Sequence, residues 1–159
     1  MTCRDDRGRE AVYAAEEAAF GGTTLEEPRP FGELRERADA IIGGDWWRRA
    51  GGPPTDVIAA RTSARSSSAH NAARPVVRLA AGQLDEATLT HELAHVLAGV
   101  DHGHDERFRS AHIDVVAVLA GSRHAVALTA SYREFGLVLG PRTWPPPVRA
   151  EGDSFVIVP

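Results

Sequence analysis

Apolar residues recur at helical spacing in five separate stretches of the chain. Residues 5–20 and 31–42 carry apolar side chains three and four positions apart, and each stretch ends at a pair of glycines. The same spacing occurs at about residues 85–98, 105–120 and 122–135, and a glycine follows each of them. Such spacing gathers apolar side chains on one face of an α-helix, and glycine often ends a helix. The pattern therefore predicts five amphipathic helices.

Between the second and third of these helices, the pattern changes to short apolar runs. Residues 56–61 (DVIAAR) and 76–80 (VVRLA) carry β-branched residues, which favours strands. Residues 62–75 between them are polar and rich in turn-forming residues. We therefore expect an antiparallel pair of strands joined by a long loop. Trp46 and Trp47, which precede the strands, are interpreted as core anchors.

The end of the chain differs from the rest in its proline content. Residues 141–147 (PRTWPPP) do not suit regular structure, and residues 154–159 (SFVIVP) are either an added strand or a loose end. A chain of 159 residues can bury one sizeable core. We therefore expect a single domain over residues 1–142, followed by a proline-rich tail over residues 143–159.

Composition and charge narrow the class of protein. The formal net charge is −4, which disfavours binding to nucleic acid. Cys3 is the single cysteine, so the chain cannot form an internal disulfide. No apolar run approaches the ~20 residues of a membrane helix, and the N-terminal stretch lacks the apolar core of a signal peptide. These features predict a cytoplasmic protein that does not associate with membranes, and no pattern indicates its oligomeric state.

The stretch THELAHVLAGVDHGHDERFR, residues 90–109, contains the candidate chemistry. His91 and His95 are four positions apart, so they project from the same face of the predicted helix and can share one metal ion. Glu92 lies beside the first of them, where a carboxylate can take a proton from a zinc-bound water. This HExxH arrangement predicts one zinc ion per chain, with Glu92 as the catalytic residue.

A third metal ligand must come from beyond Gly99, a residue that can reverse the chain direction after the helix. His102 and His104 are both within reach. The metzincin pattern would place a glycine and a histidine one position earlier than Gly99 and His102, so that class is not indicated. His104 directly precedes a predicted helix anchored by Phe108, and the start of that helix aims His104 at the metal. We favour His104, and His102 is the alternative.

Four other polar residues are candidates for supporting roles. Asp105 follows His104 and can contact the ligands or the substrate. His70 precedes the second predicted strand and is either a group that stabilises an oxyanion or a plain loop residue. His112 fits a packed role and a functional role equally well. Asp114 is interpreted as a surface acid rather than a hydrogen-bond partner of a ligand histidine.

These motifs resemble known zinc peptidases. HELAHVLAG followed by HDERF resembles the SprT-like and Wss-type zinc peptidases, in which a third histidine and a phenylalanine follow HExxH. More specifically, roughly residues 4–142 resemble a small actinobacterial and phage family of HExxH metallohydrolases. The matching parts are RDDRGREAVYAAE, the Trp46–Trp47 pair, DVIAAR with the later AHN, the HELAH helix and ASYREFGLVLGPR. That family usually has glycine after the third histidine, where this chain has Asp105.

The resemblance implies a fold and a mode of substrate binding. The fold would be α+β and zincin-like, with a small, mostly antiparallel sheet packed on the HExxH helix and further helices around both. A peptide substrate would add as a strand to one edge of the sheet. We expect residues 75–79 to form that edge, because a proline such as Pro75 at the start of a strand is typical of an edge position.

The function predicted from these residues is zinc-dependent hydrolysis, with a peptide or protein as the expected substrate of a metallopeptidase. His91, His95 and His104 would hold zinc and leave one position open for water. Glu92 would accept the proton as that water attacks the scissile carbonyl, and would then pass it to the leaving amine.

Three alternatives remain at this point. AHVLAGVDH resembles the bacterial rRNA-maturation endoribonucleases. Its last histidine, however, lies one residue further along than in their motif. Glu92 also occupies a position that this family does not use for a general base. A non-catalytic zinc-binding module would close its coordination with both His102 and His104. A peptidase domain that serves as a regulatory sensor is the third alternative.

Overall fold

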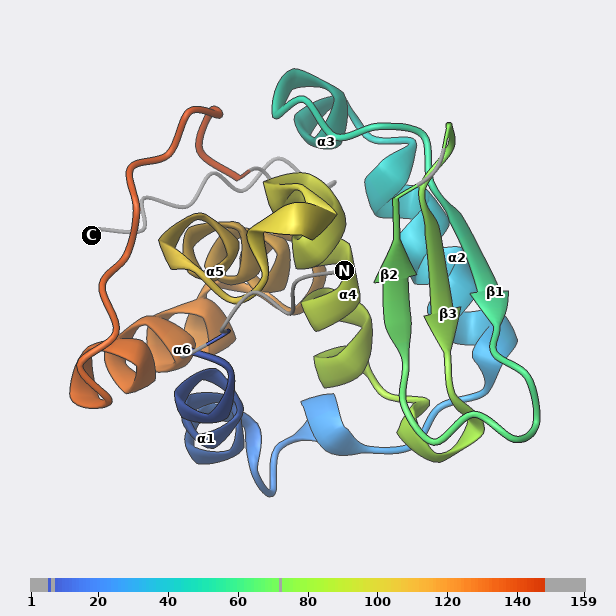
Figure 1. Cartoon of the computed structure of the whole chain (residues 1–159), viewed down its shortest axis with the longest axis horizontal. Coiled ribbons are helices and arrows are strands. Elements are labelled where there is room, and N and C mark those ends of the chain that lie inside the picture. Colours follow the sequence, from blue (N-terminus) through green and yellow to red (C-terminus); the bar gives the residue numbers. More distant parts are fainter. Residues whose placement is uncertain (1–5, 7, 72, 148–159) are drawn as a thin grey trace.

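The computed structural model describes residue 6, residues 8–71 and residues 73–147 (Figure 1). Within these residues the fold is α+β, as expected, with six α-helices and one sheet of three strands. None of these helices is both long enough and apolar enough to cross a lipid bilayer. Cys3 and residues 154–159, the expected strand or loose end, lie outside the described part. The elements are α1 (Arg9–Phe20), η1 (Thr24–Glu26), α2 (Phe31–Ile42), α3 (Asp45–Arg49), β1 (Asp56–Ala59), β2 (Ser68–His70), β3 (Val76–Leu79), η2 (Ala81–Gln83), α4 (Glu86–Ala98), η3 (Val100–His102), α5 (Glu106–Ala120) and α6 (Ser122–Glu134).

The helical spacing in the sequence corresponds to real helices. The five predicted stretches are α1, α2, α4, α5 and α6, and their ends differ from the prediction by a few residues at most. The largest difference is at α1, which begins at Arg9, whereas Asp5, the expected first residue, lies outside the described part. Trp46 and Trp47 lie in the additional short helix α3 and are buried, which confirms them as core anchors.

The sheet differs from the expected antiparallel pair. Its strand order is β1-β3-β2, in which β3 pairs in parallel with β1 and antiparallel with β2. β2 lies within residues 62–75, which were expected to form a loop. Its three residues, Ser-Ala-His, give almost no apolar signal. Because β2 reverses the chain direction, β3 can run alongside β1, and the sheet is mixed rather than mostly antiparallel.

The prediction that residues 75–79 form a sheet edge is wrong, because β3 is the central strand. Pro75 stands just before β3, and its carbonyl accepts a hydrogen bond from the N–H of Asp56 at 3.0 Å. The missing N–H of this proline therefore costs the sheet no hydrogen bond. The two edges are β1, which contacts α2, and β2, which lies against α4 (Figure 1).

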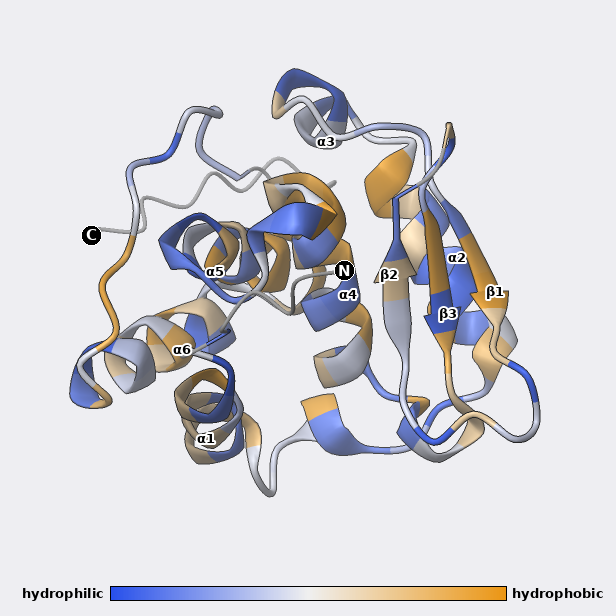
Figure 2. Cartoon of the chain, viewed as in Figure 1, coloured by the Kyte–Doolittle hydropathy of each residue, from blue (hydrophilic) through white to orange (hydrophobic). Residues whose placement is uncertain are grey.

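Helix α4 is enclosed between the sheet and the other helices. α5 packs on α4, α6 packs on α5, and α1 packs on α6. Leu89 and Leu93 of α4 are fully buried, as are Phe108 and Ile113 of α5. Figure 2 shows hydrophobic residues along α4, β1 and β3. Burial of each such side chain stabilises the fold by about 1.5–3 kcal/mol. The position of α4 in the domain is therefore fixed by its packing.

The folded domain extends beyond residue 142, into the segment expected to be a tail. Trp144 is only 6% exposed, and its indole N–H donates to Asp114 Oδ2 at 2.7 Å. The same oxygen accepts a hydrogen bond from Arg142 Nε at 2.8 Å. Asp114 is fully buried on α5, so it is neither a surface acid nor a partner of a ligand histidine. Its carboxylate fastens the C-terminal segment to the helix layer.

We predict that Asp114→Ala destabilises the protein by about 3–5 kcal/mol, because it leaves the Arg142 charge and the Trp144 N–H without their acceptor. The measurement is the free energy of unfolding from urea titration. Asp39→Ala is the control, since Asp39 forms only an exposed pair with Arg35 on α2 and should cost less than ~0.5 kcal/mol. Equal effects of the two substitutions would contradict the assignment.

Candidate metal centre

Helix α4 presents two histidines on one rigid face. Its first turn is capped by Asp85, whose carboxylate accepts a hydrogen bond from the N–H of Thr88 at 2.7 Å. Gly99 ends the helix with φ at 99°, a conformation that other residues rarely adopt. Because α4 is continuous between these ends, His91 and His95 lie one turn apart and point to the same side.

Three imidazole nitrogens meet beside this face. His91 Nε2 lies 3.1 Å from His104 Nε2 and 3.2 Å from His95 Nε2. His104 reaches the cluster from the turn before α5, and the rings of all three histidines lie against Phe108. These three side chains form a group that could hold a metal ion. The predicted set of ligands is thus brought together by the fold.

The structure separates His102 from this cluster. His102 Nδ1 lies 2.8 Å from Asp105 Oδ2, and the His102 side chain is 45% exposed. The other oxygen of Asp105 caps α5 by accepting hydrogen bonds from two backbone N–H groups. Asp105 therefore starts the helix and holds His102 away from the site. Among the two alternatives for the third ligand, the geometry favours His104.

Two carboxylates orient the ligand rings from behind. Glu16 Oε1 lies 2.8 Å from His91 Nδ1, and Asp6 Oδ2 lies 2.6 Å from His104 Nδ1. A carboxylate at Nδ1 favours the tautomer with its proton on that nitrogen, which leaves a lone pair on Nε2. The Nε2 lone pairs of His91 and His104 are thereby directed at the same point.

Burial keeps the ligand imidazoles neutral. Desolvation lowers the pKa of His91 to about 4, and desolvation with the nearby His91 and His104 lowers the pKa of His95 to about 3. Neutral imidazole is the form that binds metals. Burial also raises the pKa of Glu16 to about 8, although His104 partly offsets this effect. A cation held by the histidines would add a further positive charge near Glu16 and favour its ionised form.

The spacing of the three nitrogens suits a small divalent cation. Tetrahedral coordination with Zn–N bonds of about 2.0–2.1 Å places two ligand nitrogens about 3.3–3.4 Å apart. The observed separations of 3.1 and 3.2 Å are close to this spacing. A cation placed between the three nitrogens would be attracted by the lone pair that each neutral imidazole can offer at Nε2. These three residues would hold a four-coordinate ion with one position left for water.

His112 lies behind Glu16 and is completely buried. Its Nδ1 is 2.7 Å from the hydroxyl of Tyr132, and its Nε2 is 3.5 Å from Glu16 Oε1. Glu16, His91 and His112 form a second group that could hold a metal ion. An ion bound there through Glu16 and His91 Nδ1 would replace the 2.8 Å contact that orients the His91 ring. We therefore assign His112 to the packing that supports Glu16.

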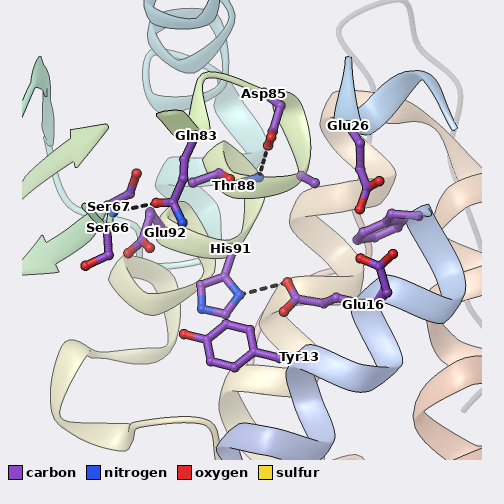
Figure 3. Close-up of a pocket in the computed structure, with 13 residues that line it drawn as sticks. Tyr13, Glu16, Glu26, Ser66, Ser67, Gln83, Asp85, Thr88, His91 and Glu92 are labelled. Atoms are coloured by element: carbon purple, nitrogen blue, oxygen red, sulfur yellow. Dashed lines mark hydrogen bonds and ion pairs between the residues drawn. The ribbon is translucent and has the colours of Figure 1, made fainter. Parts of the chain in front are cut away.

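Glu92 faces a cavity of about 300 Å³ that opens beside His91 (Figure 3). Glu92 is only 7% exposed, and no described residue forms a hydrogen bond with its carboxylate. Desolvation, together with the nearby Glu16, raises the pKa of Glu92 to about 7. A carboxylate with such a pKa can take up and release a proton near neutral pH.

His70 is not brought into the site. It lies at the end of β2, is exposed, and places Nε2 2.9 Å from Ser68 Oγ. It lies neither in the group of three histidines nor in the lining of the cavity beside Glu92. These contacts favour the interpretation of His70 as a residue outside the site over a role in stabilising an oxyanion.

Sequence reasoning did not identify Asp6, Glu16 or Tyr13. The Tyr13 ring stacks on His91, with centroids 5.5 Å apart and planes inclined by 11°. Glu16 lies four positions after Val12, on the buried face of α1. An ionisable side chain in an apolar stripe is uncommon, and this signal could have indicated Glu16. No pattern marks Asp6, because its role depends on how the chain enters α1.

Comparison of the chain with protein-family models, with curated proteins and with solved structures finds no match. The resemblance to HExxH metallohydrolases therefore stays a prediction from the motif. The positions and chemistry of the three histidines and Glu92 are what indicate a function.

We predict that the purified protein binds one zinc ion and that His104→Ala abolishes this binding, because the cluster then keeps only two nitrogens. His102→Ala is the matched control and should bind zinc as the wild type does. Elemental analysis after dialysis gives the stoichiometry. Zinc loss in His102→Ala, with retention in His104→Ala, would reverse the assignment of the third ligand.

We predict that Glu16→Gln weakens zinc binding by roughly 10–100-fold, the usual effect of removing a carboxylate that orients a ligand histidine. Competition with a chromophoric chelator measures the affinity. Glu17→Gln is the control, because Glu17 is the exposed neighbour of Glu16 on the same helix. Unchanged affinity in Glu16→Gln would mean that the contact with His91 is incidental.

Proposed function

We propose that the protein is a zinc-dependent metallopeptidase in which Glu92 is the general base. The main support is one juxtaposition: three neutral imidazoles meet at a point, and a buried carboxylate without a hydrogen-bond partner follows the first of them on the same helix. Structural zinc sites are closed by four side chains. In the described part of the chain, no fourth ligand joins the group of His91, His95 and His104.

The side chains around this point have distinct tasks in hydrolysis. A bound zinc ion would supply Lewis-acid chemistry, polarising a carbonyl and making a water molecule more acidic. Glu92 would accept a proton from the attacking water and deliver it to the leaving amine. Glu16 and Asp6 would hold the rings of His91 and His104 in the orientation that this reaction needs.

The free edge of β2 supports a peptide as the substrate. Among the described strands β2 pairs only with β3, and it lies against α4. Ser66 and Ser67, immediately before β2, line the same cavity as Glu92. An extended peptide added to this edge would pass the metal centre while its backbone formed hydrogen bonds with β2. β2 therefore replaces residues 75–79 as the expected docking edge.

Two alternative functions receive less support. An endoribonuclease must hold a phosphodiester, but the cavity beside Glu92 is lined by five carboxylates, which would repel phosphate. A closed zinc-binding module requires His102 as a fourth ligand, but the ring of His102 faces Asp105.

We predict that Glu92→Gln lowers peptide hydrolysis by at least ~100-fold, because an amide cannot accept the proton of water. The zinc content should equal that of the wild type, since Glu92 is not a ligand. The measurement is the rate of cleavage of denatured casein by the zinc-loaded protein, with elemental analysis of both samples. Similar rates for the two proteins would remove Glu92 from the reaction, and loss of zinc from the variant would make it a ligand.

A further inference from the structure

The cavity beside Glu92 has an unusual balance of charge. Its lining contains five carboxylates and neither arginine nor lysine. The walls come from α1, η1, the residues before β2, the end of η2 and the start of α4. Figure 3 shows Glu16, Glu26 and Glu92 around this space, beside His91.

Not all of these carboxylates are available to a ligand. Asp85 is engaged as the cap of α4, and Glu16 is engaged with His91. Glu17 and Glu26 form no ion pair with a basic side chain in the described part of the chain. Desolvation and the charge of Glu17 raise the pKa of Glu26. The two glutamates thus repel each other, and a cation between them would relieve that repulsion.

Glu92 provides an independent sign that the cavity receives a ligand. It is more than nine-tenths buried, it lines the cavity, and no described residue satisfies its carboxylate. Buried polar groups in folded proteins are nearly always hydrogen-bonded. The Glu92 carboxylate lines the cavity, so water or a ligand group in the cavity would supply its hydrogen bond.

We propose that this cavity is a specificity pocket for a positively charged side chain, arginine or lysine, next to the scissile bond of a peptide substrate. This inference rests on the proposed peptidase function. A volume of about 300 Å³ lies at the lower end of ligand pockets, roughly 300–1,000 Å³, and so suits one long side chain. Phe20 and Ala87 provide apolar wall for the methylene stem, while Glu17 and Glu26 are placed for the charged head.

The test compares the cleavage of two peptides that differ only in one side chain, arginine or citrulline. Citrulline has nearly the shape of arginine but carries no charge. A synthetic peptide library first identifies the cleaved bond, and the arginine and citrulline versions of the best sequence are then compared with the zinc-loaded full chain. We expect kcat/KM to be roughly 10-fold higher for arginine, as two partly exposed carboxylates would give together.

The decisive variant is Glu17→Gln with Glu26→Gln, which should reduce this ratio to about 2-fold or less. Both residues are exposed, so the fold should tolerate the change. The matched control is Glu10→Gln with Glu27→Gln, which removes the same number of exposed charges from the same two segments outside the cavity and should keep the preference.

Each outcome has a distinct meaning. Cleavage without preference for basic residues would overturn the specificity pocket and leave the peptidase intact. A preference that persists in the Glu17 and Glu26 variant would also overturn the pocket, because the charge would then be recognised elsewhere. Failure of the zinc-loaded protein to cleave any library peptide would overturn the proposed peptidase function and this inference with it.

Discussion

The rest of the site depends on the meeting of three imidazole Nε2 atoms at one point. His91, His95 and His104 place their Nε2 atoms 3.1 and 3.2 Å apart in two successive contacts. Neutral imidazole nitrogens gathered in this way are well placed to hold a cation. The surrounding structure holds it in place: Glu16 and Asp6 fix two rings from behind, and Phe108 packs against all three.

The fold explains how so small a domain can maintain this arrangement. α4 lies between the sheet and α5, so its ligand face cannot turn without disrupting the core. α1, near the start of the chain, packs beside the site and contributes both Glu16 and Tyr13. The same architecture places one edge of the sheet, β2, against α4, the helix that carries His91 and His95.

The local part of the site could be predicted from the sequence, and the long-range part could not. The spacing of His91 and His95 follows from helical periodicity, and the start of α5 was enough to favour His104 over His102. The decisive contact, between Asp105 and His102, is also local. Glu16 and Asp6 approach from 75 and 98 positions away along the chain, and helical spacing does not reveal such pairings.

The sheet was predicted least well, for a physical reason. β2 is held by backbone hydrogen bonds to β3 and by packing near α4, rather than by an apolar side-chain pattern. Because β2 was not predicted, residues 56–61 and 76–80 were expected to pair in antiparallel fashion. Once β2 reverses the chain direction, the parallel pairing of β1 with β3 follows, and the free edge moves to β2.

Zinc-edge X-ray absorption spectroscopy of the wild-type protein tests the central claim most directly. An open centre predicts a first shell of three imidazole nitrogens at about 2.0–2.1 Å and one oxygen from solvent. A shell of four protein ligands would contradict the proposed enzyme, because no position would remain for the reacting water. A protein that takes up no zinc would contradict the metal centre itself.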